Sequence, residues 1–376
     1  MVPRRSFVRG RFRAPLLSAG IMLVAYWATA AVVLAVDPYD LYPWGRRPMV
    51  AAGHFQRGTH DQLLVSAAAK DPTWDVVSIG SSTARMYSAR EIAQAFPGTR
   101  SALNVAYAGS RPMDRHMVVT QFVRHSAARR LLIWFDWTYA LAATDLKPAF
   151  PSYMYDDAWL NDLRLVTPPS LISAWHMLSS GEPFPDAPET TPDREKTPPG
   201  PFQTRRSMDS IARVVELNRA TVDLPTERTC DQFDALRTQA LPAARALAAR
   251  GTQVDFVLPA YSLVFYYPST RVRGDMVRLS EQLLLRRCLV EETAGIPGVR
   301  VVALDRDLQV VSDLGNYRDD AHLYYGPGLR VLERFVEPAY ELTPANIDHY
   351  VNTLREAVKH YRVVNSHLAS DVKSGS

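Results

Sequence analysis

The sequence contains little cysteine and no spacing of cysteine and histidine that is typical of a metal site. Only Cys230 and Cys288 are present among 376 residues. In an oxidising compartment they can form one disulfide, and they can also remain two buried thiols, because their spacing does not decide between these states. We expect no metal and no other cofactor.

Basic residues are not in excess outside the N-terminal tail. The formal net charge is +4, from 43 Lys and Arg against 39 Asp and Glu, but five arginines lie within residues 1–13. Without those five, 38 basic residues stand against 39 acidic ones, a net charge of −1. A nucleic-acid-binding domain needs a basic face of its own, so we expect no nucleic-acid partner.

Only one apolar run is long enough to cross a membrane. Residues 14–36 contain no charged side chain, and at about 1.5 Å per residue they span a hydrocarbon core of roughly 30 Å. Arginines precede the run and acidic residues, Asp37 and Asp40, follow it, which favours a cytoplasmic N-terminus and a main domain outside the cytoplasm.

A cleaved signal peptide is the alternative to this anchor. Small residues near the end of the run, Ala28, Ala30 and Ala31, fit a cleavage site. The apolar stretch of a signal peptide is about 7–15 residues, which is shorter than this run. We therefore favour an uncleaved anchor.

Beyond the anchor, short apolar strands alternate with helical patterns. The sequence predicts strands at residues 74–79, 102–105, 131–137, 254–258 and 299–303, and helices at 83–95, 113–127, 208–220, 230–250, 274–292, 328–340 and 344–364. This alternation favours an α/β fold with a parallel sheet covered by helices on both faces. Ligands bind such sheets at the carboxyl ends of the strands, so the residues after each strand are candidates for a functional site.

The predicted layout has five parts: a basic tail at 1–13, the anchor at 14–36, a linker at 37–73, one domain at 74–365 and a flexible tail at 366–376. Within the domain, the region from the third strand to about residue 180 is aromatic and has no regular pattern. Residues 181–206 contain seven prolines, which predicts an exposed loop.

The first strand leads into Gly80-Ser81-Ser82 and then a predicted helix. A serine at the start of a helix lies close to free backbone N–H groups, which can stabilise an oxyanion. The same serine can simply cap the helix. The second strand leads into Asn104 and, five residues later, Gly109, whose backbone N–H can reach the same place or can belong to an ordinary turn.

Near the C-terminus, Asp319 and His322 stand three residues apart, just before Gly326-Pro327-Gly328 and a predicted helix. A serine nucleophile needs a base, and the base needs a carboxylate that orients it. Alone, the pair is as readily structural, and Asp320 is the alternative acid. Together with Ser82 it predicts a catalytic triad.

These three blocks, in this order, resemble the SGNH (GDSL-like) hydrolase superfamily. The resemblance implies a three-layer, flavodoxin-like parallel sheet with Ser82 as nucleophile, His322 as general base and Asp319 as the orienting acid. It also implies that the backbones of Gly109 and Ser82 donate to the oxyanion. The sequence around the segments "VVSIGSSTAR", "NVAYAGS" and "DDAHLYYGPG" looks like that of a branch of envelope-associated bacterial proteins with one membrane anchor. This resemblance implies that the anchor lies in the inner membrane and that the main domain is periplasmic.

Two positions depart from that family pattern. Many members carry an Asn after the third strand whose amide donates to the oxyanion, whereas this chain has Asp136. An ionised aspartate has no hydrogen to donate, so Asp136 points elsewhere, or Asn104 or Arg111 replaces it, or activity is weak or lost. The usual Asp before the nucleophile is replaced by Ser81, a form shared by relatives that handle envelope polymers.

Other residues near the strand ends are weaker candidates. Arg85 follows Ser82 by one predicted helical turn and either binds an anionic group or is solvated. Aromatic residues after the third strand can stack on sugar rings or pack in the core, and core packing is favoured: Trp134, Trp137 and Tyr139. Tyr261 and Ser262 follow the fourth strand and are expected to line the same cleft.

We expect a serine esterase or O-acyltransferase that acts on an extracytoplasmic polysaccharide, with acetyl as the expected acyl group. A membrane acyltransferase or a polysaccharide-synthesis protein is the expected partner. The alternative is a catalytically weak or inactive binding or assembly component of an envelope polysaccharide machine, which Asp136 motivates. A lipase-like hydrolase is a weaker reading, since no apolar lid is evident.

Overall fold

A computed structural model describes residues 13–38, 42, 65–66, 69, 73–141, 145–146, 150–156, 161–181, 208–267 and 278–363. Most of the basic tail, most of the expected linker and the C-terminal tail lie outside these residues. Of the proline-rich segment expected at 181–206, only Gly181 is described.

The chain divides into two compact units. The first combines Met1–Ala67 with Pro151–Pro188, and the second combines Ala68–Phe150 with Glu189–Ser376. The region expected to be irregular is divided between the units, because its part up to Phe150 belongs to the second unit and its part from Pro151 belongs to the first. The part in the first unit contains helix α6 (Pro168–Ser180), which the sequence pattern did not predict.

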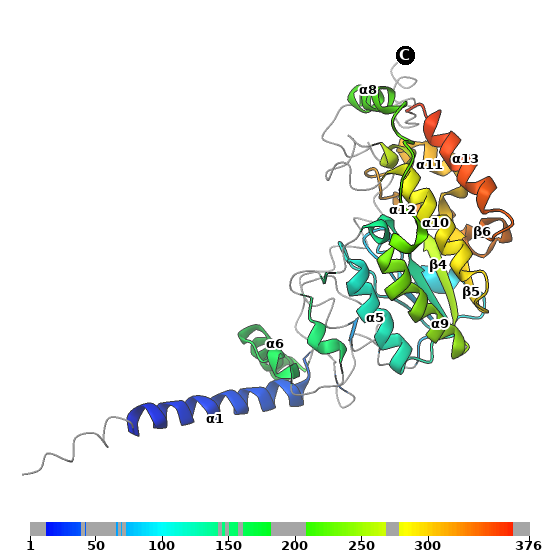
Figure 1. The fold of residues 1–376 in the computed structure, drawn as a ribbon. Coiled ribbons are helices and arrows are strands. Elements are labelled where there is room, and N and C mark those ends of the chain that lie inside the picture. Colours follow the sequence, from blue (N-terminus) through cyan, green and yellow to red (C-terminus); the bar gives the residue numbers. More distant parts are fainter. Residues whose placement is uncertain are drawn as a thin grey trace, which may run out of the picture. The chain divides into compact units, whose positions relative to one another are not determined.

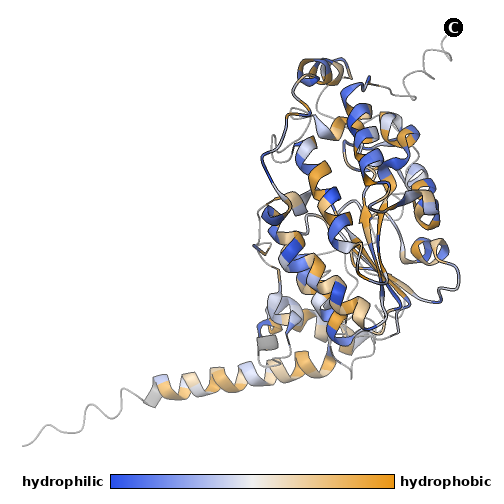
Figure 2. Ribbon diagram, turned by 45° about the vertical axis from the view of Figure 1, so that its right-hand side comes forward, coloured by the Kyte–Doolittle hydropathy of each residue, from blue (hydrophilic) through white to orange (hydrophobic). Residues whose placement is uncertain are grey.

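In the first unit, helix α1 (Arg13–Val36) packs against α6. Helix α1 is long and apolar enough to cross a membrane, as a signal sequence also is. Only 11% of an 18-residue apolar stretch of this helix is buried, and Figure 2 shows the helix coloured mainly as hydrophobic. An apolar helix that buries so little of its surface is not a core helix of a water-soluble domain.

The second unit is built on a six-stranded sheet in the order β2-β1-β3-β4-β5-β6, in which β6 is antiparallel to β5 and the other pairs are parallel. The strands are β1 (Val76–Ile79), β2 (Ala102–Asn104), β3 (Arg130–Trp134), β4 (Gln253–Leu258), β5 (Val299–Ala303) and β6 (Glu341–Leu342). The five predicted strands are confirmed, and the two-residue β6 was missed.

The strands form because they are short, apolar and largely buried, as expected for a parallel sheet covered on both faces. All four residues of β1 are buried, as are four of the five in β3. Helices α5 (Pro112–His125) and α9 (Leu241–Ala249) pack against each other over the strands (Figure 1). Helix α4 (Ala89–Ala95) packs against α12 (Tyr325–Glu333). The fold class expected from the sequence, α/β with a mainly parallel sheet flanked by helices, is confirmed.

The helices of this unit are α4 (Ala89–Ala95), α5 (Pro112–His125), α8 (Met208–Asn218), α9 (Leu241–Ala249), α10 (Leu279–Thr293), α11 (Leu308–Ser312), α12 (Tyr325–Glu333) and α13 (Ile347–Lys359). The helix predicted at 230–250 is broken into a short 3₁₀ turn, a π-helical stretch and α9. The helix predicted at 83–95 begins only at Ala89, because Ser88 and Glu91 form a capping box there.

Cys230 and Cys288 are joined by a disulfide. It links the turn at the start of the α9 region to α10, across a sequence separation of 58 residues. The structure thus selects the disulfide from the two alternatives that the sequence left open. A disulfide fits an oxidising compartment.

Candidate active site

Ser82 lies in a turn directly after β1, and not at the start of a helix as the sequence predicted. The turn begins at Gly80, where a Cβ atom would lie 2.6 Å from Cβ of Ala84 and 2.8 Å from Cβ of Trp134. No side chain fits there without movement of its neighbours. Glycine therefore lets the chain turn tightly over the end of β3, and this turn carries Ser82.

Asn104, at the end of β2, holds the same turn in place. Its side-chain amide donates to the carbonyl oxygens of Ala84, at 2.9 Å, and Tyr87, at 2.6 Å. Its own oxygen accepts from the backbone N–H of Ala106. Both amide hydrogens are thus used on the backbone that follows Ser82, so the expected role as oxyanion donor is replaced by a structural one.

Asp319 and His322 lie on a loop that is closed by backbone pairing. Tyr317 and Leu323 form an antiparallel bridge, and the N–H of Arg318 donates to the carbonyl of His322 at 2.8 Å. The loop is tied to the end of β4, because the hydroxyl of Ser262 donates to the carbonyl oxygen of Asp320 at 2.7 Å. Ser262 therefore positions this loop.

The structure brings Ser82, His322 and Asp319 together in one hydrogen-bonded chain. Nε2 of His322 lies 2.8 Å from Oγ of Ser82. Nδ1 of His322 lies 2.6 and 2.8 Å from the two carboxylate oxygens of Asp319. With the Nδ1 proton on the Asp319 side, Nε2 is free to accept the hydroxyl proton of Ser82, which is the arrangement that a serine nucleophile needs.

Asp319 is held as a carboxylate. Burial raises the pKa of this carboxyl group, but the hydrogen bond and charge of His322 outweigh it and leave the pKa below its usual value. The backbone N–H groups of Ala321 and His322 also donate to Asp319, each at 3.0 Å. These bonds leave the acid ionised and fix it against the imidazole.

Two backbone N–H groups near Ser82 are available as oxyanion donors. Within the described part of the chain, the amides of Ser82 and Gly109 have no hydrogen-bond acceptor. Gly109 has a φ of 68°, a left-handed conformation that glycine adopts without strain. The neighbouring Ser110 donates its hydroxyl to the carbonyl of Gly80 at 3.0 Å, which ties the Gly109 turn to the Ser82 turn.

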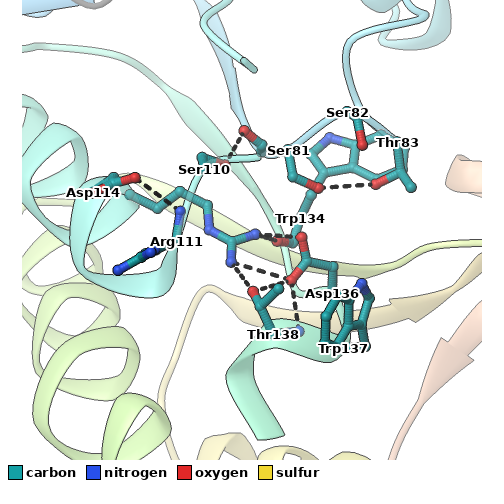
Figure 3. A network of polar contacts seen from close by, with 12 residues as sticks. Ser81, Ser82, Thr83, Ser110, Arg111, Asp114, Trp134, Asp136, Trp137 and Thr138 are labelled. Carbon is teal, nitrogen blue, oxygen red and sulfur yellow. Dashed lines mark hydrogen bonds and ion pairs between the residues drawn. The ribbon is translucent and has the colours of Figure 1, made fainter. Parts of the chain in front are cut away.

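Asp136 forms a buried ion pair with Arg115, a residue of α5 that the sequence reasoning missed. Nη1 and Nη2 of Arg115 lie 2.7 and 3.1 Å from the two oxygens of Asp136, and Thr138 also donates to this carboxylate (Figure 3). Burial raises the pKa of Asp136, but the charge of Arg115 and the hydrogen bonds from Arg115, Ser81 and Thr138 together outweigh burial, so the pKa is lowered. An ionised, paired Asp136 has no hydrogen for an oxyanion.

The remaining candidates fall into two groups. Trp134 and Tyr139 are buried, with 2% and 3% of their surface exposed, so the core-packing alternative is confirmed for both. Trp137 and Arg85 are partly exposed. The side chain of Arg111 points away from Ser82 (Figure 3) and donates to the carbonyl of Leu146, so it does not replace the missing amide donor.

No family model matches this sequence, and no curated protein matches it at a significant level. Within the described residues, no cluster of three or more His, Cys, Asp or Glu side chains could hold a metal ion. The function therefore has to be argued from the geometry of the site.

Proposed function

We propose that the protein is a serine-dependent acyl-transfer enzyme. The observation that carries this proposal is the chain from Ser82 through His322 to Asp319, with 2.8 Å between Oγ and Nε2 and 2.6 Å between Nδ1 and the carboxylate. These are the contacts by which a base activates a hydroxyl nucleophile and an acid orients the base.

In the proposed reaction, Oγ of Ser82 attacks the carbonyl carbon of an ester while Nε2 of His322 takes the hydroxyl proton. The negative charge on the carbonyl oxygen is stabilised by the N–H groups of Ser82 and Gly109. Collapse of this intermediate breaks the ester bond, and His322 returns the proton to the departing alkoxide. Ser82 then carries the acyl group.

The second half-reaction releases the acyl group to an acceptor. His322 removes a proton from the acceptor oxygen, which attacks the acyl-Ser82 ester, and the proton then returns to Oγ. With water as acceptor the product is a free acid, and the protein is an esterase. With a sugar hydroxyl as acceptor the product is a new ester, and the protein is an O-acyltransferase.

The SGNH hydrolase superfamily is the family that we propose for this chain. The strand order 2-1-3-4-5 with parallel strands is the flavodoxin-like order. The three sequence blocks around Ser82, Gly109 and His322 meet at the carboxyl ends of the strands, as that family requires. The side chains of Asn104 and Arg111 donate to backbone carbonyls elsewhere, so in this proposal the oxyanion support comes from the backbone.

We propose an acylated glycan outside the cytoplasm, with acetyl as the transferred group. Helix α1 is suited to hold the protein at a membrane, and a basic tail before it favours a cytoplasmic N-terminus. The partly exposed Trp137, next to Asp136, offers an aromatic face for a sugar ring. An O-acyltransferase of this kind would receive its acyl group from a membrane acyltransferase.

The alternative, a catalytically weak or inactive binding or assembly component, was motivated by Asp136 in place of an amide donor. Arg115 neutralises the charge of Asp136 but does not supply the missing donor, so catalysis in our proposal depends on the backbone N–H groups of Ser82 and Gly109. No other described feature of the site favours this alternative over catalysis.

Hydrolysis of p-nitrophenyl acetate by the purified full-length protein tests the proposal. We expect turnover that falls by a factor of at least about 10³ in Ser82→Ala and His322→Ala, as in other triad enzymes. Unchanged thermal unfolding of both variants would show that the fold is intact. Equal rates for the wild type and Ser82→Ala would exclude Ser82 as the nucleophile.

A further inference from the structure

Helix α6 (Pro168–Ser180) has its apolar residues on the outside. Trp175, Leu178 and Ile172 are 70%, 60% and 58% exposed, and Leu171 is 38% exposed. The buried positions of the same helix are instead small: Ser170, Ser173 and Ala174. A helix of a water-soluble domain shows the opposite arrangement, with large apolar side chains facing inwards.

We propose that this outward face of α6 is inserted in the phospholipid bilayer beside α1, in the interfacial region of one leaflet. The face consists of Leu171, Ile172, Trp175 and Leu178, which recur at helical spacing on one side. Tryptophan is the side chain that prefers the boundary between lipid and water. The occupant is lipid because α6 packs against α1 (Figure 1), the helix suited to span a membrane.

The polar groups of α6 are arranged for a medium with little water. All four serine hydroxyls of the helix donate to backbone carbonyls: Ser170 to Leu165, Ser173 to Pro169, and Ser179 and Ser180 to His176. Thr167 caps the first turn by accepting from the N–H of Ser170, and Gly181 ends the helix with a φ of 72°. Unpaired polar groups in hydrocarbon are costly, and these are paired.

Charge and length point to the same location. No Asp, Glu, Lys or Arg occurs from Leu165 to Gly181. A helix of 13 residues is about 20 Å long, which is too short to cross a hydrocarbon core of roughly 30 Å. A short, uncharged helix that exposes apolar residues therefore lies in the plane of the interface. A hydrogen bond also holds this segment beside α1, because the hydroxyl of Tyr26 donates to the carbonyl oxygen of Leu163, just before α6, at 3.3 Å.

The test places a fluorescent label on this face in the full-length protein. Cys230 and Cys288 are joined, so a cysteine introduced by Trp175→Cys or Ile172→Cys is the only free thiol for an environment-sensitive NBD label. The matched control is Leu217→Cys on α8, because Leu217 is apolar and 75% exposed but belongs to the other unit. Each protein is reconstituted in phosphatidylcholine–phosphatidylglycerol vesicles.

We expect the labels at Trp175 and Ile172 to be shifted to the blue, to be quenched by lipids with a doxyl group near the headgroup, and to lose quenching by aqueous iodide. The label at Leu217 should keep its iodide quenching. Iodide quenching at both α6 positions equal to that at Leu217 would overturn the proposal. Protection from iodide without quenching by doxyl lipid would also overturn it, because protein would then cover the face.

Discussion

Asp136 accepts hydrogen bonds from both terminal nitrogens of Arg115, at 2.7 and 3.1 Å, and neither side chain has more than 2% of its surface exposed. Arg115 comes from α5 and Asp136 follows β3, so the pair ties a helix to the end of the central strand. Removing one partner of a buried pair leaves an uncompensated charge. Arg115→Leu should therefore lower the free energy of unfolding by about 3–5 kcal/mol.

Urea denaturation measures this loss, and a double variant provides the control. Arg115→Leu with Asp136→Asn removes both charges, and should be less destabilised than Arg115→Leu alone. Additive effects of the two substitutions would contradict a direct coupling between the residues.

The same pair makes a prediction about acid stability. The pKa of Asp136 is lowered in the folded protein, and that of an unfolded aspartate is about 3.9. Its contribution is thus fully present above about pH 4 and is lost as the pH falls through the lower, folded pKa. The wild type should lose more stability on acidification below about pH 4 than the Arg115→Leu/Asp136→Asn variant, measured by urea unfolding. The pKa of Asp319 is also lowered. Asp319 is present in both proteins, so its contribution does not produce the expected difference between them.

Gly80 should not accept a side chain. In Gly80→Ala the new Cβ would lie within 3 Å of Ala84 and Trp134, so we expect a loss of about 1–3 kcal/mol from overpacking and a displaced Ser82. Gly295→Ala is the matched control, because a Cβ at Gly295 meets no atom within 4 Å. The midpoint temperature of thermal unfolding and the rate of ester hydrolysis should both fall in Gly80→Ala. Both should stay near the wild-type values in Gly295→Ala.

The acid of the triad can be distinguished from its neighbour. Asp319 contacts Nδ1 of His322, and in Asp319→Asn that contact no longer stabilises the charged imidazole. We expect kcat for a p-nitrophenyl ester to fall by about 10³–10⁴, as in serine proteases with the same change. Asp320→Asn, one residue away, should retain most activity. A larger loss in Asp320→Asn than in Asp319→Asn would assign the role to Asp320.

The disulfide should contribute measurably to stability. It closes a loop with a sequence separation of 58 residues, for which chain entropy predicts about 4 kcal/mol. Cys230→Ser with Cys288→Ser should lower the free energy of unfolding by that order under non-reducing conditions. A reductant should destabilise the wild type and leave the double variant unchanged. Equal stability of the wild type and the double variant under non-reducing conditions would contradict the expected contribution.

Five of the six strands were predictable because they are short runs made mainly of apolar residues. That Ser82 and the loop of Asp319 and His322 lie close together was predictable because the strands of a parallel sheet bring their carboxyl ends to one edge. The start of α4 was missed although the capping box of Ser88 and Glu91 marks it locally. The contacts that hold the preceding turn in a non-helical conformation come from Asn104 and Trp134, which are distant in sequence. Local helical pattern cannot register such contacts.

Arg115 and α6 were missed for different physical reasons. A single arginine in an amphipathic helix is usually solvated, and only the fold places Asp136 against it. Helix α6 carries two prolines at its start and four serines, which by local propensity indicate an irregular segment. The large apolar residues of α6 also face outwards. A pattern that assigns apolar residues to the core of a water-soluble domain therefore does not identify this helix correctly.

The most direct test of the central proposal is covalent labelling of Ser82 in the full-length protein. A fluorophosphonate probe reacts with an activated serine, and intact-mass and peptide mass spectrometry locate the adduct. We predict one adduct, on Ser82, that is absent from Ser82→Ala and strongly slowed in His322→Ala. No adduct on the folded wild type, or an adduct that persists in Ser82→Ala, would contradict the proposed catalytic role of this serine.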